Sequence, residues 1–216
     1  MADFNLEGSH RKGLRATRSK LQKLGCSFEI VSVEQVPSII PRLGEISDAW
    51  LAEKNSSEKG FSLGFFDEEY LSRYPCVVIR QEERIIAFAN VWLGANCFEF
   101  SIDLMRYEKS SLNGLMDYLF MELFLWGKAN GYQWFNMGMA PLSGIASRPL
   151  APMWNKAIGL LYHHGEHFYG FEGLRHYKDK FDPVWHPKYI ASPGGIALLR
   201  MLADITTLVG RKHNSA

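Results

Sequence analysis

A chain of 216 residues, of which 47% are hydrophobic and 13% aromatic, can bury one substantial core, which excludes a disordered or low-complexity protein. The net charge of +1 excludes a polycation that binds nucleic acid through its overall charge. Three widely separated cysteines, Cys26, Cys76 and Cys97, fit neither a disulfide framework nor a metal-binding spacing, so we expect buried thiols and no metal. No apolar run is near the length that crosses a bilayer.

The first predicted element is a basic amphipathic helix at residues 11–24, which Gly25 ends. Its apolar stripe consists of Leu14, Leu21 and Leu24. Between residues 8 and 28 there are six lysines and arginines and no acid. Three of the arginines fall on one helical face, at Arg11, Arg15 and Arg18. We predict that these arginines point outward and bind a polyanion; a solvated basic face is the alternative.

The elements that follow alternate between strands and helices. We predict, in chain order, a strand at 26–34, helices at 37–54 and 67–73, three meandering strands at 76–80, 85–93 and 98–105, a helix at 114–130, a strand at 132–141 and a helix at 153–164. The stretch 171–191 is predicted to hold a short helical piece and a last strand near 188–191, and a terminal helix follows at 196–209. In the helix at 37–54, the residues on the predicted core side are Ile40, Leu43, Ile46, Ala49 and Trp50.

This order predicts an α/β (α+β) protein, with a mixed sheet and helices on both of its faces. It is the layout of the acetyltransferase-like (GNAT) fold. We predict a basic linker helix at residues 1–26 and a GNAT-like domain at residues 27–216.

Members of this fold that use acetyl-CoA carry an Arg/Gln-x-x-Gly-x-Gly/Ala loop between a central strand and a helix. Backbone N–H groups of that loop hold the pyrophosphate at the helix N-terminus. The corresponding stretch here, "EKSSLNGLMD", has the single glycine Gly114 and does not fit the spacing. We therefore expect no CoA and no other cofactor, and an acetyl-CoA-dependent acetyltransferase is disfavoured.

A charged pair is predicted where the strand "FEFSIDLM" passes into the next loop. Asp103 and Arg106 are three residues apart, a spacing that lets both reach one groove if the strand breaks at Met105. Ends of strands are where open α/β sheets bind ligands. The pattern alone favours an ion pair that fixes the loop, and a substrate site is the alternative.

Several separate motifs in the sequence resemble a known family. "SIDLMRY", "NGLMDYLF", "FNMGMAPLSG" and "FEGLRHYKDKFDPVWHPKYIA" are similar to the C-terminal cytosolic domain of bacterial phosphatidylglycerol lysyl- and alanyltransferases, the multiple peptide resistance factors. The resemblance extends from about Leu6 to Gly195. It implies a tandem of two GNAT-like folds joined by a basic helix, of which this chain is expected to be the helix and the second half.

The resemblance also implies a reaction and partners. Family members transfer lysine or alanine from aminoacyl-tRNA to the hydroxyl of phosphatidylglycerol, which changes membrane charge and gives resistance to cationic peptides. The expected partners are aminoacyl-tRNA, phosphatidylglycerol, the upstream GNAT-like half and a membrane domain. The expected location is the cytoplasmic face of the cell membrane.

The family motifs turn several residues into candidates for the site. Asp103 is expected to bind the ammonium of the donor, and Arg106 a phosphate or carbonyl oxygen. The cationic stretch "RHYKDK" supplies Lys178 as a catalytic residue, with Arg175 and Lys180 as substrate-binding residues. The remaining candidates for substrate binding, each with a structural alternative, are Tyr70, Asn136 and Ser143.

Two alternatives remain beside the transferase. One is a non-catalytic half-domain that binds tRNA or anionic lipid, and the other is the disfavoured acetyltransferase. The choice between lysine and alanine stays open, because it depends on the shape of the pocket.

Overall fold

The computed structural model describes residues 1, 4–53, 64–108, 112–140 and 171–189, with the single positions 191, 197, 200, 201 and 204. It divides into two compact units, Met1–Asn136 with Ser192–Ala216, and Met137–Ala191. The predicted helix at 153–164 and the candidate Ser143 lie outside the described residues.

The first unit is built on a five-stranded sheet in the order β1-β2-β3-β4-β5, so strands that follow one another in sequence are neighbours in space. The strands are β1 (Cys26–Val31), β2 (Cys76–Gln81), β3 (Arg84–Leu93), β4 (Glu99–Tyr107) and β5 (Trp134–Asn136). The first four pair antiparallel, and β5 pairs parallel to β4. A parallel pair requires a crossover connection, which the helix α4 (Leu115–Ala129) supplies.

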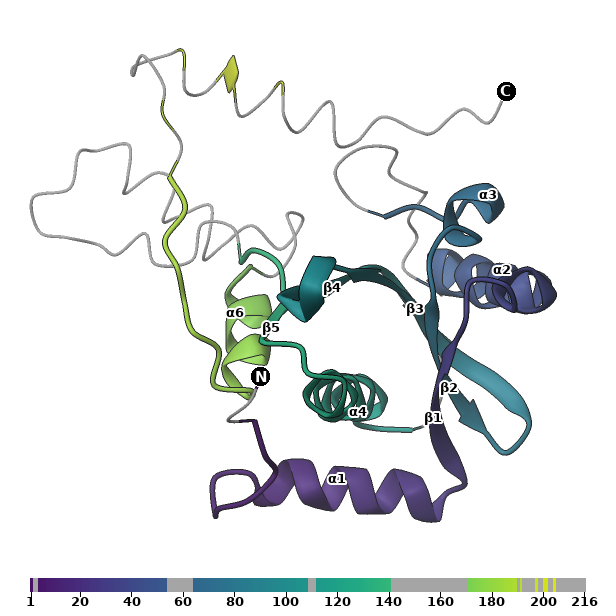
Figure 1. Ribbon diagram of the computed structural model, residues 1–216, viewed down its shortest axis with the longest axis horizontal. Coiled ribbons are helices and arrows are strands. Elements are labelled where there is room, and N and C mark those ends of the chain that lie inside the picture. Colours follow the sequence, from purple (N-terminus) through teal and green to yellow (C-terminus); the bar gives the residue numbers. More distant parts are fainter. Residues whose placement is uncertain are drawn as a thin grey trace, which may run out of the picture. The chain divides into compact units, whose positions relative to one another are not determined.

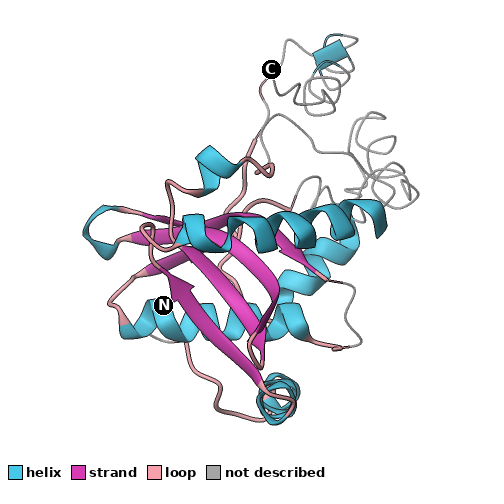
Figure 2. Cartoon of the chain, turned by 90° about the vertical axis from the view of Figure 1, so that its right-hand side faces the viewer, coloured by secondary structure: helices cyan, strands magenta, loops and turns pink. Residues whose placement is uncertain are grey.

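Helices cover both faces of this sheet. The helix α4 lies on one face with α1 (Lys12–Lys23) beyond it, and α2 (Val36–Glu53) and the short α3 (Glu68–Leu71) lie against the other (Figure 1, Figure 2). A 3-10 turn, η1 (Ala95–Cys97), connects β3 to β4. The predicted mixed α/β sheet with helices on both faces, in the GNAT layout, is confirmed.

On the α4 face, aromatic rings surround Phe100 of β4. The ring of Phe100 lies 4.8 Å from those of Tyr132 and Phe135 and 5.6 Å from that of Trp126, measured between centroids. The helix comes so close that a Cβ on Gly127 would lie 2.3 Å from the Phe100 ring. A glycine is therefore required where α4 crosses β4.

On the opposite face, a core of aliphatic and aromatic residues joins α2 to the sheet. Its fully buried members include Leu43 and Ile46 of α2, Phe88 of β3 and Leu104 of β4. The helix α2 continues through Pro41, as predicted. The prediction that Ala49 faces the core is wrong, because Ala49 is exposed and Ser47 is buried instead.

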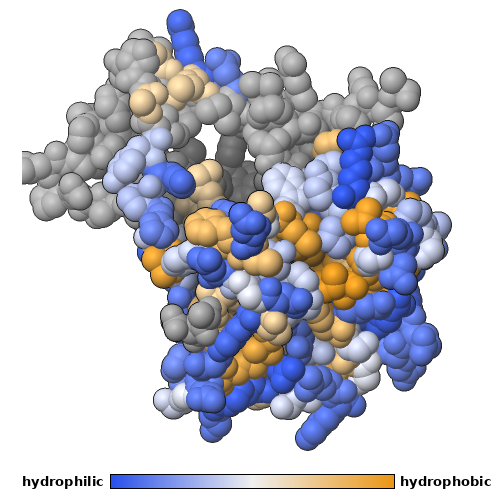
Figure 3. Space-filling model, in the orientation of Figure 1, coloured by the Kyte–Doolittle hydropathy of each residue, from blue (hydrophilic) through white to orange (hydrophobic). Residues whose placement is uncertain are grey.

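The helix α1 packs on α4, and its position agrees with the predicted basic helix. Leu14 and Leu21 are buried as predicted, but Leu24 is 41% exposed, so the third member of the apolar stripe is wrong. Its exposed side chains give the lower edge of the molecule a hydrophilic surface in Figure 3. Within the described part of the chain, no helix combines the length and apolar composition that crossing a bilayer requires.

The second unit is described mainly through α6 (Phe171–Asp179), which agrees with the predicted helical segment. Lys188 and Tyr189, where the sequence predicts a last strand, belong to no strand, so that prediction is wrong for these two residues. In the first unit, the isolated positions 197, 200, 201 and 204 are helical, in agreement with the predicted terminal helix.

Candidate active site

A β-bulge in β4 sets the geometry of the candidate site. Val91 pairs with Ile102 and Ala89 pairs with Met105, so the single residue Asn90 faces two residues of β4, Asp103 and Leu104. The backbone N–H of Leu104 donates a hydrogen bond of 2.7 Å to Oδ1 of the fully buried Asn90. The side chain of Asn90 thus takes over a ladder bond that the extra residue interrupts.

The bulge brings Asp103 and Arg106 to one face of the sheet. Two residues three apart in a regular strand point to opposite faces. Here Leu104 packs in the core beneath α2, Asp103 contacts Tyr70 beside that core, and Arg106 contacts Trp50 of α2. The prediction that the strand breaks at Met105 is wrong, because β4 continues to Tyr107. The extra residue has the effect that the break was expected to have.

Asp103 is held by a tyrosine from α3. Asp67 caps this short helix by accepting a 2.7 Å hydrogen bond from the backbone N–H of Tyr70. The Tyr70 hydroxyl donates a hydrogen bond of 2.6 Å to Oδ2 of Asp103. Burial, followed by the hydrogen bond to Asp103, raises the pKa of Tyr70 to about 12, so the phenol keeps its proton at neutral pH. The structure thus joins two predicted site residues.

The segment before α3 closes over Asp103. A Cβ on Gly64 would lie 2.6 Å from Oδ2 of Asp103 and 2.7 Å from the backbone nitrogen of Leu104. Only glycine lets the backbone come so near the bulge without a shift. The carboxylate of Asp103 therefore lies between a phenol and a peptide backbone.

Arg106 stacks on an indole. Its guanidinium carbon lies 4.2 Å from the centroid of the Trp50 ring, and its Nη1 donates to the carbonyl oxygen of Met105 at 3.2 Å. The cation–π contact fixes the guanidinium plane, which leaves the fork a defined direction. Asp103 and Arg106 form no ion pair with each other among the described interactions, so the predicted simple ion pair is not what the structure contains.

In the second unit, Lys178 is buried, with 7% of its surface exposed. Its Nζ donates to the carbonyl oxygens of Gly138 and Met139, at 3.1 and 3.0 Å. Burial lowers the pKa of this lysine. A lysine held by neutral carbonyls in a desolvated position is a candidate for proton transfer or oxyanion binding, in addition to its structural role.

The other predicted residues occupy more exposed positions. Arg175 stacks on Trp185 at 4.4 Å from the ring centroid, and Lys180 lies 4.8 Å from that of Tyr177. Both belong to the second unit. In the first unit, Nδ2 of Asn136 donates to Oε1 of Glu99 at 3.3 Å. Their substrate roles, and that of Ser143, stay predictions.

The predicted outward orientation of the α1 arginines is wrong for Arg11, which is 8% exposed and lies over the ring of Phe4 at 4.9 Å. Arg15 donates to the carbonyl oxygens of Leu6 and Gly8. Arg18 forms a bidentate ion pair with Glu122 of α4, at 2.7 and 3.1 Å. These arginines fasten α1 and the N-terminal segment to the fold, and the sequence could not show their partners.

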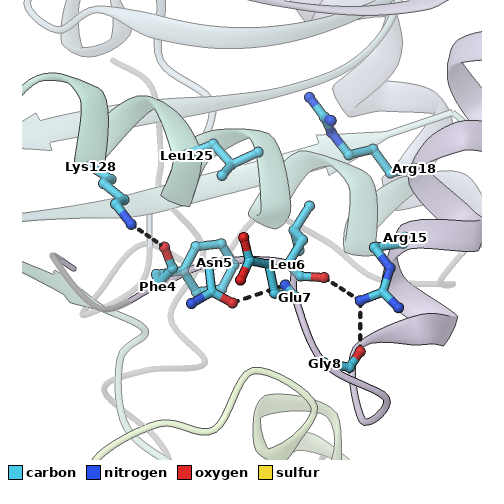
Figure 4. Close-up of a pocket in the computed structure, with 9 residues that line it drawn as sticks. All are labelled: Phe4, Asn5, Leu6, Glu7, Gly8, Arg15, Arg18, Leu125 and Lys128. Carbon is cyan, nitrogen blue, oxygen red and sulfur yellow. Dashed lines mark hydrogen bonds between the residues drawn. The ribbon is translucent and has the colours of Figure 1, made fainter.

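The N-terminal segment, α1 and α4 line an open pocket of about 580 Å³ (Figure 4). The close-up shows Lys128 donating to the carbonyl oxygen of Phe4, and Arg15 reaching the backbone of Leu6 and Gly8. Arg15 and Lys128, two of the cations that line it, therefore already bind backbone carbonyl oxygens of the chain itself. The pocket is lined by none of the predicted catalytic residues.

Sequence reasoning missed three residues of the site. Asn90 reads as one polar residue in an apolar strand, Trp50 as a core residue, and Gly64 as part of a loop. A buried asparagine within "IIAFANVWL" is a signal that could have been noticed, since a polar side chain in a central strand needs a partner.

The mixed sheet with a bulge in β4 and helices on both faces places the chain in the GNAT-like fold class. Residues 1–192 match the family described as phosphatidylglycerol lysyltransferase, C-terminal. The chain therefore belongs to the family of phosphatidylglycerol lysyltransferase C-terminal domains. The resemblance that the motifs indicated is confirmed.

Relatives in two genera carry the lysyltransferase name. The chain is 37% identical over 215 residues to phosphatidylglycerol lysyltransferase from Bacillus subtilis, covering 99% of this chain and 25% of that protein. It is 39% identical over 191 residues to the Staphylococcus xylosus protein, covering 88% of this chain and 22% of that one. The chain thus spans about a quarter of the length of these relatives.

Two solved structures are similar over nearly the whole chain. One is the C-terminal domain of a lysylphosphatidylglycerol synthetase from Agrobacterium fabrum, with a TM-score of 0.84, 38% identity, and coverage of 99% of this chain and 64% of that one. The other is L-PGS from Bacillus licheniformis, with a TM-score of 0.77, 39% identity, and coverage of 97% and 63%.

Proposed function

We propose that the chain supplies the aminoacyl-transfer domain of a phosphatidylglycerol lysyltransferase. In this reaction the ester bond between the amino acid and the ribose of tRNA breaks, and a new ester forms with a hydroxyl of phosphatidylglycerol. The proton of that hydroxyl passes to the released ribose oxygen. The match of residues 1–192 to the family is the observation that carries the proposal.

Lysine is the proposed amino acid, because the relatives carry the lysyltransferase name. An anionic lipid that receives lysine gains two ammonium groups, which reduces the attraction of the membrane for cationic peptides. The proposed setting is the cytoplasmic surface of the membrane, with aminoacyl-tRNA as the donor and an upstream GNAT-like half and a membrane domain as partners. Residues 1–26 are proposed as the linker to that half, and residues 27–216 as the transferase domain.

An aminoacyl ester is already reactive, so positioning the two substrates can supply most of the acceleration. We assign Asp103 to the α-ammonium of the donor, because its carboxylate is oriented by Tyr70 and lies in the bulge of β4. Arg106, oriented by Trp50, is assigned to the lipid phosphate or the developing oxyanion. Lys178 is assigned to the same reaction as an oxyanion or proton-transfer group.

The remaining predicted residues are proposed to bind the substrates. Tyr70 acts through Asp103, whereas the other members of this group are Asn136, Ser143, Arg175 and Lys180. On the basic helix, Arg11 is buried and Arg18 is paired with Glu122. We therefore propose that the exposed lysines of α1 bind the polyanion, together with the partly exposed Arg15.

No role for CoA is proposed. In acetyl-CoA-dependent members of the fold, the pyrophosphate lies at the N-terminus of the helix that follows the bulged strand. Here a Cβ on Gly114, the N-cap of α4, would lie 2.4 Å from Cγ2 of Thr17, so α1 packs against that end of the helix.

The proposal is tested with a chimera in which residues 1–216 replace the matching quarter of the Bacillus subtilis relative. Phosphatidylglycerol vesicles and tRNA charged with radiolabelled lysine or alanine are the substrates. Label should enter the lipid fraction from lysyl-tRNA and not from vesicles that lack phosphatidylglycerol. A chimera that is folded, binds tRNA and transfers no label would contradict the proposal and favour the non-catalytic binding module.

A further inference from the structure

A second carboxylate lies on the same face of β4 as Asp103. In the register of the sheet, Phe88 pairs with Arg106 and Trp92 with Ser101, and Glu99 pairs with Trp134 of β5. Partners in a register share a face. Since Asn136 pairs with Ser101 and also donates to Glu99, the side chain of Glu99 lies on the face that carries Asp103 and not on the α4 face.

Both acids accept hydrogen bonds from neutral side chains. Among the residues that the structure describes, Glu99 and Asp103 form no ion pair, and their hydrogen bonds come from neutral donors, Asn136 and Tyr70. On β4 itself, the residue between them on this face is Ser101, which has a small side chain. Two partly exposed carboxylates on one strand face thus have no ion-pair partner among the described residues.

An independent feature of the same face indicates a ligand. The amide of Asn90 is fully buried, and its Oδ1 must face Leu104, because a backbone N–H can only donate. Its Nδ2 therefore faces away from the N–H of Leu104, and the Asn90 side chain is near enough to Tyr70 to lower the pKa of that phenol. Among the described residues this nitrogen has no hydrogen-bond partner. A buried N–H₂ group without an acceptor is rare in folded proteins.

The distance between the carboxylates suits a diamine. Four residues of strand span about 13 Å, slightly less across a bulge. The α- and ε-nitrogens of an extended lysine are separated by six bonds, or about 7 Å. With a charge-assisted hydrogen bond of about 2.8 Å at each end, such a ligand reaches from one carboxylate to the other.

The walls of this face suit a lysine side chain as well. Trp92 and Trp134, on the strands either side of Ser101 and Glu99, are 44% and 45% exposed. Exposed indoles on the two flanks offer apolar contact to methylene groups and a cation–π contact to an ammonium. Alanine would use neither the indoles nor the second carboxylate.

Resting on the proposed lysyl transfer, we propose that Glu99 binds the ε-ammonium of the lysyl group while Asp103 binds its α-ammonium. Glu99 is then the residue that selects lysine over smaller or uncharged amino acids. The Asn90 amide, Trp92 and Trp134 complete the binding face. An acceptor atom of the bound aminoacyl group, such as its carbonyl oxygen, would satisfy Nδ2 of Asn90.

The test compares the binding of L-lysine amide and L-norleucine amide, which has the same carbon chain without the ε-ammonium. Calorimetric titration of the chain should show lysine amide binding about 10- to 100-fold more tightly than norleucine amide. Glu99→Gln should abolish this preference while leaving norleucine amide binding unchanged. The matched control is Glu83→Gln, in the turn between β2 and β3, which should keep the full preference.

Each outcome has one meaning. A wild-type chain without a preference for lysine amide, or a Glu99→Gln chain that keeps it, overturns the inference. Asp103→Asn separates the inference from the proposed function, because it should weaken both amides equally. If Asp103→Asn leaves both affinities unchanged while Glu99→Gln removes the preference, the assignment of Asp103 fails and that of Glu99 stands.

Discussion

The backbone N–H of Leu104 is bonded to the side-chain oxygen of Asn90, at 2.7 Å, in the interior of the sheet. This one contact stabilises the bulge that puts Asp103 on the same face as Arg106. The hydrogen bond from Tyr70 then orients the carboxylate of Asp103. The site thus depends on a buried amide that contacts neither charged residue through a hydrogen bond.

Replacing this amide should destabilise the first unit. Asn90→Leu leaves the Leu104 N–H buried without an acceptor, which costs about 1–3 kcal/mol in the free energy of unfolding. Urea denaturation followed by circular dichroism measures the loss. Asn113→Leu, at an exposed position, should stay within about 0.5 kcal/mol of wild type. An Asn90→Leu protein as stable as the control would mean that the bulge does not depend on the amide.

Adding one methyl group at Gly64 should disturb the site. The new Cβ would meet Asp103 and the backbone of Leu104, so one of them must move. We expect Gly64→Ala to weaken amino-acid amide binding at least about tenfold, as a displaced charged hydrogen bond would. Gly13→Ala, where a Cβ meets nothing within 4 Å, should leave binding unchanged and stabilise α1 by up to about 1 kcal/mol. Equal affinities in the two variants would contradict the close approach.

Two tyrosines with raised pKa values should make the fold sensitive to alkali. Burial raises the pKa of Tyr118, which is 2% exposed, to about 12, and the pKa of Tyr70 is raised equally far. The pKa of a tyrosine in the unfolded chain is about 10, so between pH 10 and 12 the unfolded state holds fewer protons than the folded state. The free energy of unfolding must then fall as pH rises through this window.

Tyr118→Phe should make that fall less steep, measured by urea denaturation at pH 9, 10 and 11. Tyr189→Phe, on a side chain that is 87% exposed, is the control and should reproduce the wild-type slope. The same slope in all three proteins would show that the phenol of Tyr118 ionises as readily in the folded state as in the unfolded one.

On α1, charge reversals should separate folding from polyanion binding. Arg18→Glu breaks the bidentate pair with Glu122, whose side chain is 12% exposed, and should lower the melting temperature by several degrees. Reversal of the exposed Lys12, Lys20 and Lys23 should leave the melting temperature nearly unchanged and weaken binding to tRNA or anionic vesicles.

The salt dependence of that binding tests whether α1 contacts the phosphates of the polyanion. A variant that makes fewer phosphate contacts releases fewer counterions when it binds. The slope of log affinity against log salt concentration should therefore be smaller in the triple lysine variant. If this variant binds with wild-type affinity and slope, α1 has a structural role and the nucleic acid is bound elsewhere.

Much of the fold follows from local patterns. The alternation in "CVVIR" and "IIAFANVWL", separated by polar residues, predicts the β2–β3 hairpin, and the apolar helix after Gly114 predicts α4. These signals are local because the hydrophobic periodicity that indicates a strand or helix lies within the residues of that element. Asp103 and Arg106 could also be selected, but only through the resemblance to a family.

What the sequence could not show are contacts over long separations. Glu122 is 104 residues from Arg18, so nothing near α1 reveals that its arginine is neutralised. The bulge has the same origin, because it depends on the register between β3 and β4 and not on either strand alone. A single extra residue reverses the face on which a side chain lies.

The most direct test of the account is the rate of lysyl transfer to phosphatidylglycerol by the chimera carrying Asp103→Asn. This substitution keeps the size of the side chain and its bond to Tyr70 while removing the charge that is assigned to the donor ammonium. We predict a fold unchanged by circular dichroism and a loss of kcat/KM of at least about 100-fold, equivalent to about 3 kcal/mol of transition-state stabilisation. Transfer at the wild-type rate by a folded Asp103→Asn protein would contradict the account.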